Sequence, residues 1–176
     1  MEKKTAPKNE SIDSKKLNLA KQVAARQFLR FYKNGGHQNI VFKKTDDPTI
    51  YYFMFTGLGD LFRDGVYLGE IKITESYIKP PLVTMYTPTG VYPVNTHNFC
   101  ISIGHYHAND YCPGIGIDGF VRCVLSGLEN WRELGEGINL IATADSEENE
   151  QLIRRLATSS VEYNNTNNRH ILAYFE

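Results

Sequence analysis

The sequence has few cysteines, no long hydrophobic run and almost no net charge. Three cysteines, at positions 100, 112 and 123, give no even disulfide framework, which favours a reducing compartment. The sequence contains no stretch of 18 apolar residues and therefore predicts no transmembrane helix. Its first residues also lack the apolar core of a secretory signal. A formal net charge of −1 gives no electrostatic bias toward nucleic acid. We therefore expect a cytoplasmic or nuclear protein that has no membrane anchor and binds no nucleic acid.

A length of 176 residues, with 41% hydrophobic and 22% charged residues, is typical of one soluble globular domain. The polar, lysine-rich segment 1–13 has no periodicity and predicts a flexible N-terminal tail. Residues 14–176 then form the folded domain.

Apolar residues recur at helical spacing between Ser14 and Lys33, with Ser14 as the expected N-cap and Gly35-Gly36 as the end signal. Every charge in this segment is basic: Lys15, Lys16, Lys21, Arg26, Arg30 and Lys33. A solvated face is the usual interpretation of such a run. Docking to an acidic partner is the alternative hypothesis, because charges of one sign provide no ion pairs along the helix.

Segments 40–42, 50–55 and 66–73 are rich in β-branched and aromatic residues and predict strands, and 82–86 predicts a fourth. Short turns join them without an intervening helix. This order predicts an α+β fold with a four-stranded antiparallel meander.

A long stretch without a regular period runs from Thr87 to Gly116, and such loops in compact chains are often functional. A helix is expected from Asp118, as its N-cap, to Trp131. We expect another helix over 146–160, a polar break over 164–168 and a short helix over 169–175.

Cys100 stands in the long loop, where it is either a nucleophile or a buried structural cysteine. Cys112 and Cys123 favour structural roles. Five potential zinc ligands fall within this region: His97, Cys100, His105, His107 and Cys112. Because no Cys-x-x-Cys pair is present, we predict no metal and keep a small zinc-binding domain as an alternative.

The order of the predicted elements resembles that of the ubiquitin-conjugating enzymes, and several motifs agree over about residues 14–176. Tyr77-Ile78-Lys79-Pro80-Pro81 resembles the Tyr-Pro-Phe-Lys-Pro-Pro signature of the family with one residue missing, and Cys100-Ile101-Ser102-Ile103 resembles its active-site segment. Within the family, Met85-Tyr86-Thr87-Pro88 and Asn95-Thr96 are most like the divergent branch tethered to the endoplasmic reticulum. The membrane anchor of that branch is not expected here, since the sequence stops at Glu176.

The resemblance implies a catalytic domain, expected to be monomeric, that accepts ubiquitin as a thioester on Cys100 and transfers it to a substrate with a ubiquitin ligase. A ubiquitin-activating enzyme and ATP act upstream, and the protein itself needs no cofactor. Acceptors are lysines or, as in the branch it resembles, hydroxyl groups. A ubiquitin-like modifier in place of ubiquitin and an inactive, partner-binding variant of the fold remain open alternatives.

One departure concerns the active-site loop. The usual His-Pro-Asn tripeptide is Thr87-Pro88-Thr89 here, so the role of its asparagine in supporting the loop and the oxyanion is unfilled at Thr89. Asn95 or Asn98 is the candidate replacement, His107 a candidate hydrogen-bonding assistant, and Asp110 a weaker candidate for orienting an attacking amine.

A second departure concerns partner recognition. Ile78 replaces the aromatic residue of the family signature, and with Pro113 it would form a small docking patch for a ligase. Ordinary loop packing is the alternative. The basic residues of the first helix, among them Lys15, Lys16, Arg26 and Arg30, are the expected contact for the activating enzyme and ligases.

Overall fold

The computed structural model describes residues 11–97, 99–101, 103–104, 107–133 and 146–176. Helix α1 runs over Ile12–Lys33 and begins two residues before the expected start. The expected N-cap is wrong: the hydroxyl of Ser11 accepts a hydrogen bond from the backbone N–H of Ser14 at 3.2 Å. Residues 12 and 13 of the predicted tail therefore belong to the helix, and residues 1–10 lie outside the described residues. As expected, the helix ends before Gly35, whose φ of +88° suits glycine.

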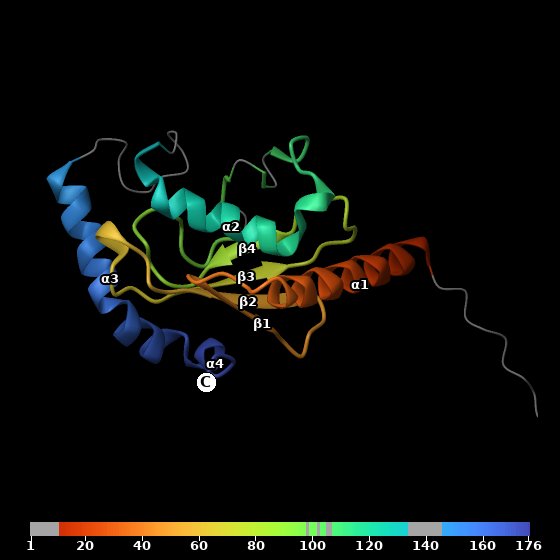
Figure 1. Ribbon diagram of the computed structural model, residues 1–176, viewed down its shortest axis with the longest axis horizontal. Coiled ribbons are helices and arrows are strands. Elements are labelled where there is room, and N and C mark those ends of the chain that lie inside the picture. Colours follow the sequence, from red (N-terminus) through yellow and green to blue (C-terminus); the bar gives the residue numbers. More distant parts are fainter. Residues whose placement is uncertain (1–10, 98, 102, 105–106, 134–145) are drawn as a thin grey trace, which may run out of the picture.

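Four strands form one antiparallel sheet in the order β1-β2-β3-β4 (Figure 1). They are β1 (Ile40–Lys44), β2 (Ile50–Phe55), β3 (Tyr67–Lys72) and β4 (Leu82–Met85). The predicted α+β fold with its meander is confirmed, including the place of every strand.

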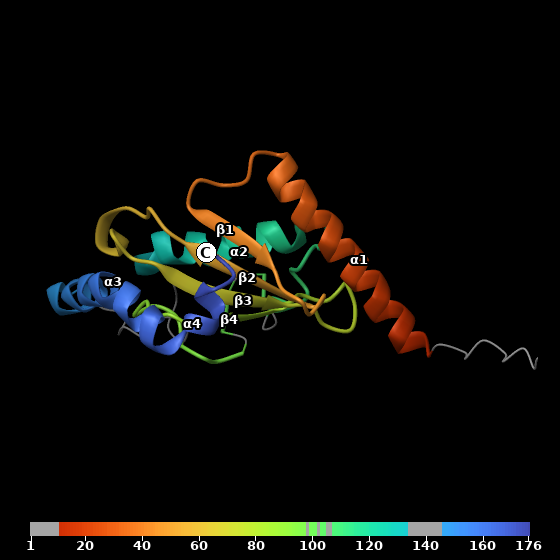
Figure 2. The same ribbon diagram turned by 90° about the horizontal axis from the view of Figure 1, so that it is seen from below.

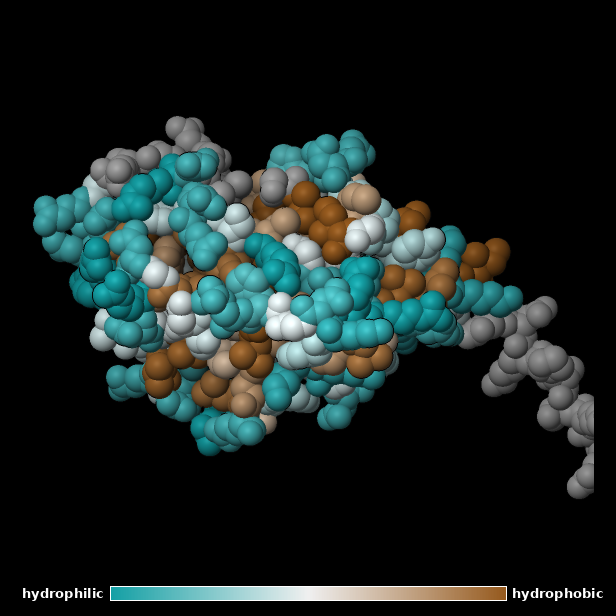
Figure 3. Space-filling model, in the orientation of Figure 1, coloured by the Kyte–Doolittle hydropathy of each residue, from teal (hydrophilic) through white to brown (hydrophobic). Residues whose placement is uncertain are grey.

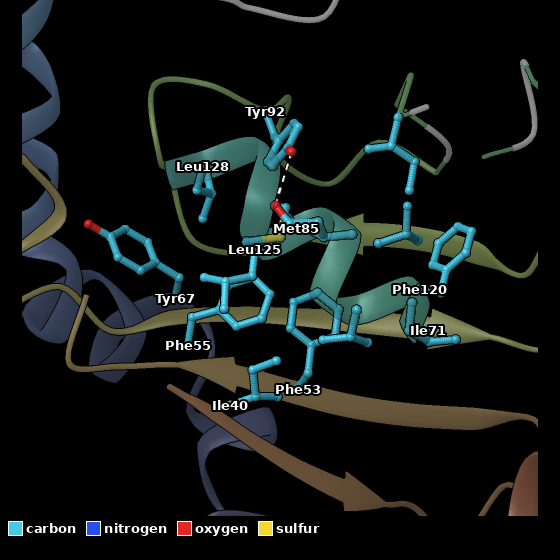
Figure 4. Packing of buried hydrophobic residues seen from close by; sticks show 14 of the residues in the cluster. Ile40, Phe53, Phe55, Tyr67, Ile71, Met85, Tyr92, Phe120, Leu125 and Leu128 are labelled. Atoms are coloured by element: carbon cyan, nitrogen blue, oxygen red, sulfur yellow. Dashed lines mark hydrogen bonds between the residues drawn. The ribbon is translucent and has the colours of Figure 1, made fainter. Parts of the chain in front are cut away.

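The core lies between the sheet and helix α2 (Gly116–Glu129), as Figure 4 shows. Strand residues alternate, so Phe53 and Phe55 of β2 are fully buried on the face toward α2. Phe120, Val124 and Leu128 fill the space from the helix. A Cβ atom at Gly69 would lie 2.2 Å from the Phe53 ring, so the packing of this ring requires glycine there.

Helix α3 (Glu147–Asn167) and helix α4 (Arg169–Leu172) end the chain (Figure 2). The expected helix end at residue 160 and the expected polar break over 164–168 are wrong. The helix continues because its polar residues Ser160 and Asn164 are buried and hydrogen-bonded to the chain on which they pack. The side chain of Ser146 caps α3.

Asp118 was expected to be the N-cap of α2, and this expectation is wrong. The helix begins at Gly116, and Asp118 lies in its first turn. Its carboxylate Oδ1 lies 3.5 Å from a guanidinium nitrogen of Arg30 on α1, so it links the two helices. Beside it, the side-chain oxygen of Gln27 accepts a hydrogen bond from the N–H of Ile117 at 3.1 Å.

Hydrophobic side chains on the face shown in Figure 3 are interspersed with hydrophilic ones, with brown patches over α1 at the right of the view. Ile12, Leu19 and Leu29 are the exposed aliphatic residues of that helix. Among the helices of the described ranges, none combines the length and apolar character needed to cross a membrane.

Candidate active site

Hydrogen bonds of two buried threonines hold the segment that follows β4. The Oγ1 of Thr87 accepts a hydrogen bond from the N–H of Leu68 at 2.9 Å and donates one to Oδ1 of Asn164 at 2.6 Å. Two residues later, Oγ1 of Thr89 accepts from the N–H groups of Val91 and Tyr92, both at 3.0 Å. Thr89 therefore supports the loop itself, although no role was predicted for its hydroxyl.

Asn164 is a functional support that sequence reasoning missed. In addition to its bond with Thr87, the side-chain amide of Asn164 donates to the carbonyl oxygen of Val66 at 2.8 Å. The side-chain amide of Asn168 donates to Oδ1 of Asn164 at 2.9 Å. Asn168 also donates to the carbonyl of Tyr86. The only sequence signal is the spacing of Ser160, Asn164 and Asn168 by four residues, which places them on one face of a helix.

Two stacked rings fix the chain just before Cys100. The rings of Tyr92 and Phe99 have centroids 4.3 Å apart and are both buried. The hydroxyl of Tyr92 donates to the carbonyl of Val124 in α2 at 3.0 Å (Figure 4). Phe99 and Ile101 are buried on either side of Cys100, which itself is only partly buried. This arrangement leaves the thiol partly accessible while its neighbours are held in the core.

The structure brings three of the predicted site residues into a chain of contacts. Sγ of Cys100 lies 3.2 Å from Nε2 of His107, within hydrogen-bonding reach for sulfur. Nδ1 of the same imidazole lies 3.9 Å from Oδ2 of Asp110. An imidazole in this place can take the proton of a thiol or donate to a thiolate, and a carboxylate on its other side orients the ring. Asp110 thus lies beside His107.

Asn95 is exposed and has a positive φ of 56°, and its N–H donates to the carbonyl of Met85 at 2.8 Å. In the part of the chain that the structure describes, no hydrogen bond joins its side chain to the Cys100 segment. Its role in oxyanion support stays a prediction. The other candidate, Asn98, lies outside the described residues.

Among the candidate zinc ligands, His107 lies beside Cys100, whereas His97 bonds elsewhere. Nδ1 of His97 shares a hydrogen bond with the hydroxyl of Thr84 at 2.8 Å. His105 lies outside the described residues. Within the ranges that the structure covers, no group of three or more His, Cys, Asp or Glu side chains is arranged to hold a metal ion. Cys112 is exposed, and burial raises the pKa of the Cys123 thiol in α2.

The predicted partner-binding residues are solvent-accessible to different degrees. Lys15, Lys16, Arg26 and Arg30 are exposed on α1, although Lys16 lies 3.8 Å from Asp13 and Arg30 pairs with Asp118. Ile78 has 60% of its surface exposed in the loop before β4. Pro113 is partly buried at the start of a short 3-10 helix, Pro113–Ile115. The joint docking patch of Ile78 and Pro113 stays a prediction.

Comparisons with known proteins agree with this fold. The chain is 31% identical over 137 residues to the protein named Ubiquitin-conjugating enzyme E2 6 of Debaryomyces hansenii, an alignment that covers 75% of the chain and 52% of that protein. It is 25% identical over 144 residues to Ubiquitin-conjugating enzyme E2 J2-like of Dictyostelium discoideum, covering 81% of the chain and 79% of the relative.

A third relative is Ubiquitin-conjugating enzyme E2 6 of Saccharomyces cerevisiae, with 29% identity over 126 residues, 70% of the chain and 46% of that protein. The chain thus spans about half the length of the two relatives named E2 6. No protein-family model matches it. The resemblance found in the sequence is nevertheless confirmed by three named relatives and by the α+β fold: the chain is a relative of the ubiquitin-conjugating enzymes E2.

Proposed function

We propose that the protein is an active ubiquitin-conjugating enzyme that carries ubiquitin as a thioester on Cys100. The observation that carries this proposal is the contact between Sγ of Cys100 and Nε2 of His107 at 3.2 Å, on a loop anchored to the core. The names of the relatives support the choice of ubiquitin as the acyl group. Its partners would be ubiquitin, an activating enzyme and a ligase, and its location the cytoplasm or nucleus.

The proposed reaction is a transthiolation. The Cys100 thiolate attacks the carbonyl carbon of the thioester that joins ubiquitin to the activating enzyme. A new carbon–sulfur bond forms at Cys100, the old one breaks, and the activating enzyme leaves as a thiolate. In this proposal the imidazole of His107, whose Nε2 lies 3.2 Å from Sγ, accepts the proton of Cys100 before the attack.

Supports for the loop act indirectly in this proposal. Hydrogen bonds accepted by Thr89 and Asn164 hold the backbone between β4 and Cys100, so that the thiol and the imidazole keep their separation. A site held by buried hydrogen bonds loses little entropy when it reacts, which is an advantage of preorganised groups.

The test is a charging assay with ubiquitin, an activating enzyme and ATP, followed by gels with and without reductant. The wild-type protein should form an adduct that reductant removes. Cys100→Ala should form none, and Cys100→Ser should form an adduct that resists reductant, because an ester replaces the thioester.

Cys112→Ser is the matched control, since Cys112 is the exposed cysteine of the chain and should not affect the adduct. Absence of the adduct from the wild type, or its survival in Cys100→Ala, would contradict the proposed function.

A further inference from the structure

Lysine and arginine are distributed very differently along the chain. All eleven lysines lie in residues 1–79, and the 97 residues from Pro80 to Glu176 contain none. The same stretch contains five of the eight arginines, so it does not lack cations in general. Cys100, its loop, α2 and α3 all belong to this lysine-free region, defined here as residues 80–176.

The fold keeps several lysine-bearing elements away from the thiol. Strand β4 forms one edge of the sheet, and the chain after it stays at this edge, where Met85 bridges to Val94 and His97 binds Thr84. Lys43 and Lys44 lie on β1, at the opposite edge. Figure 1 shows the green loops beside β4 and α2, on the side of the sheet away from β1.

Arginine makes the surface contacts of the region that lysine could also make. Arg132 pairs with Glu150 and lies 3.6 Å from Asp60, and Arg169 lies 2.8 Å from Glu176. Both arginines are exposed by more than a third, and exposed ion pairs contribute little stability with either cation. The stability of these ion pairs therefore does not require arginine in place of lysine.

The two cations differ in nucleophilic reactivity. Lysine loses its proton readily enough to attack acyl groups, whereas the guanidinium of arginine stays protonated and has no lone pair for attack. An amine tethered near a thioester sees an effective concentration on the order of millimolar or more. A lysine close to Cys100 would therefore compete with any external acceptor.

We propose that the lysine-free region prevents transfer of the acyl group from Cys100 to the chain's own amines, so that amine acceptors come from another molecule. This inference rests on the proposed function. In the reaction that is avoided, a lysine nitrogen attacks the thioester carbon, an isopeptide bond forms, and Cys100 leaves as a thiolate. The proton of the amine passes to solvent.

The experiment places one amine beside the site. Ala108 is exposed and follows His107, so Ala108→Lys adds an amine there, and Ala108→Arg adds a cation of similar length without a nucleophilic nitrogen. Arg155→Lys adds an amine on the exposed face of α3 and keeps the charge. Each protein is charged with ubiquitin, ATP is removed with apyrase, and thioester loss is followed on non-reducing gels.

Ala108→Lys should lose the thioester at least fivefold faster than the wild type. Mass spectrometry should find the ubiquitin remnant at position 108 in a reductant-resistant product. Ala108→Arg and Arg155→Lys should decay at the wild-type rate. Free lysine added to the wild type should accelerate the loss, which shows that the thioester accepts amines.

Two results would overturn the inference while leaving the proposed function in place. One is a normal adduct in Ala108→Lys that decays no faster than in the wild type. The other is equal acceleration in Ala108→Lys and Ala108→Arg, because arginine cannot accept the acyl group. Failure of the wild type to form any adduct would instead remove the proposed function, and this inference with it.

Discussion

Nε2 of His107 lies 3.2 Å from Sγ of Cys100, although the two residues are seven positions apart in the chain. The backbone that carries this imidazole is held by a hydrogen bond, in which the N–H of His107 donates to the carbonyl of Gly104 at 2.9 Å. A base and a thiol within hydrogen-bonding reach form the arrangement that activates cysteine nucleophiles.

His107→Gln should slow the charging of Cys100 by about 10²-fold, at the lower end of the range for general base catalysis. Glutamine keeps a polar side chain but cannot take the thiol proton. The measurement is the initial rate of reductant-sensitive adduct formation at limiting protein concentration. His97→Gln is the control, because His97 binds Thr84 instead of the thiol. An unchanged rate in His107→Gln would show that the contact is not catalytic.

Asp110→Asn should have a much smaller effect, at most about fivefold on the same rate, because exposed ion pairs contribute no more than about 1 kcal/mol. Asp110 is 70% exposed and its carboxylate lies 3.9 Å from the imidazole. Adding Asp110→Asn to His107→Gln should not lower the charging rate further, because the carboxylate acts through the imidazole. Additive losses in the double variant would contradict that order of action.

Thr89→Val should lower the free energy of unfolding by about 2 kcal/mol, because it leaves the buried N–H groups of Val91 and Tyr92 without their acceptor. Valine has nearly the same shape, so packing changes little. Urea denaturation measures the effect as a shift of the midpoint. Thr89→Ser keeps the hydroxyl and should recover most of the loss. Equal midpoints for Thr89→Val and the wild type would exclude the proposed support of the loop.

Stability should fall as pH rises above about 10, because burial raises the pKa of several tyrosines above the usual value. In the folded state these phenols hold their protons to higher pH than in the unfolded state. The folded state then binds more protons between the two pKa values, and the free energy of unfolding decreases with pH.

Tyr92 is the best residue at which to test this pH dependence, because desolvation is the main cause of its raised pKa. Tyr92→Phe removes this titrating group, so the free energy of unfolding should fall less as the pH rises. The difference should reach up to about 1.4 kcal/mol for each unit by which the pKa of Tyr92 is raised. The substitution should also cost about 1 kcal/mol at neutral pH through the lost bond to Val124. Urea midpoints between pH 7 and 11 measure both effects, with the exposed Tyr77→Phe as control. Parallel pH curves for Tyr92→Phe and the wild type would argue against this assignment.

The apolar pattern was sufficient to predict the elements that bury a regular stripe. Helix α1 repeats its apolar residues at the helical period and β2 alternates buried with half-buried residues, whereas β3 is buried at five consecutive positions. The strands were predicted from their β-branched and aromatic residues, which is also a property of neighbouring residues. The loop around Cys100 was also predictable, since no period survives there. The motifs that it carries then indicated the family, which the named relatives confirm.

The errors fall where polar residues are buried. Asn164 and Asn168 look like a break in a helix, because asparagine favours turns and caps when it is exposed. In the fold they reach Val66, Tyr86 and Thr87, which are about 80 to 100 residues away in the chain. No local pattern reports such partners, so the end of α3 could not be predicted.

By itself, the sequence determined the order of the helices and strands, because this order depends on composition and local periodicity. Only the tertiary structure decided that Thr89 supports the loop, that Asp118 binds Arg30 and that His107 meets Cys100. Each of these contacts depends on how segments pack in space, and hydrogen bonds between packed segments are set by the whole fold.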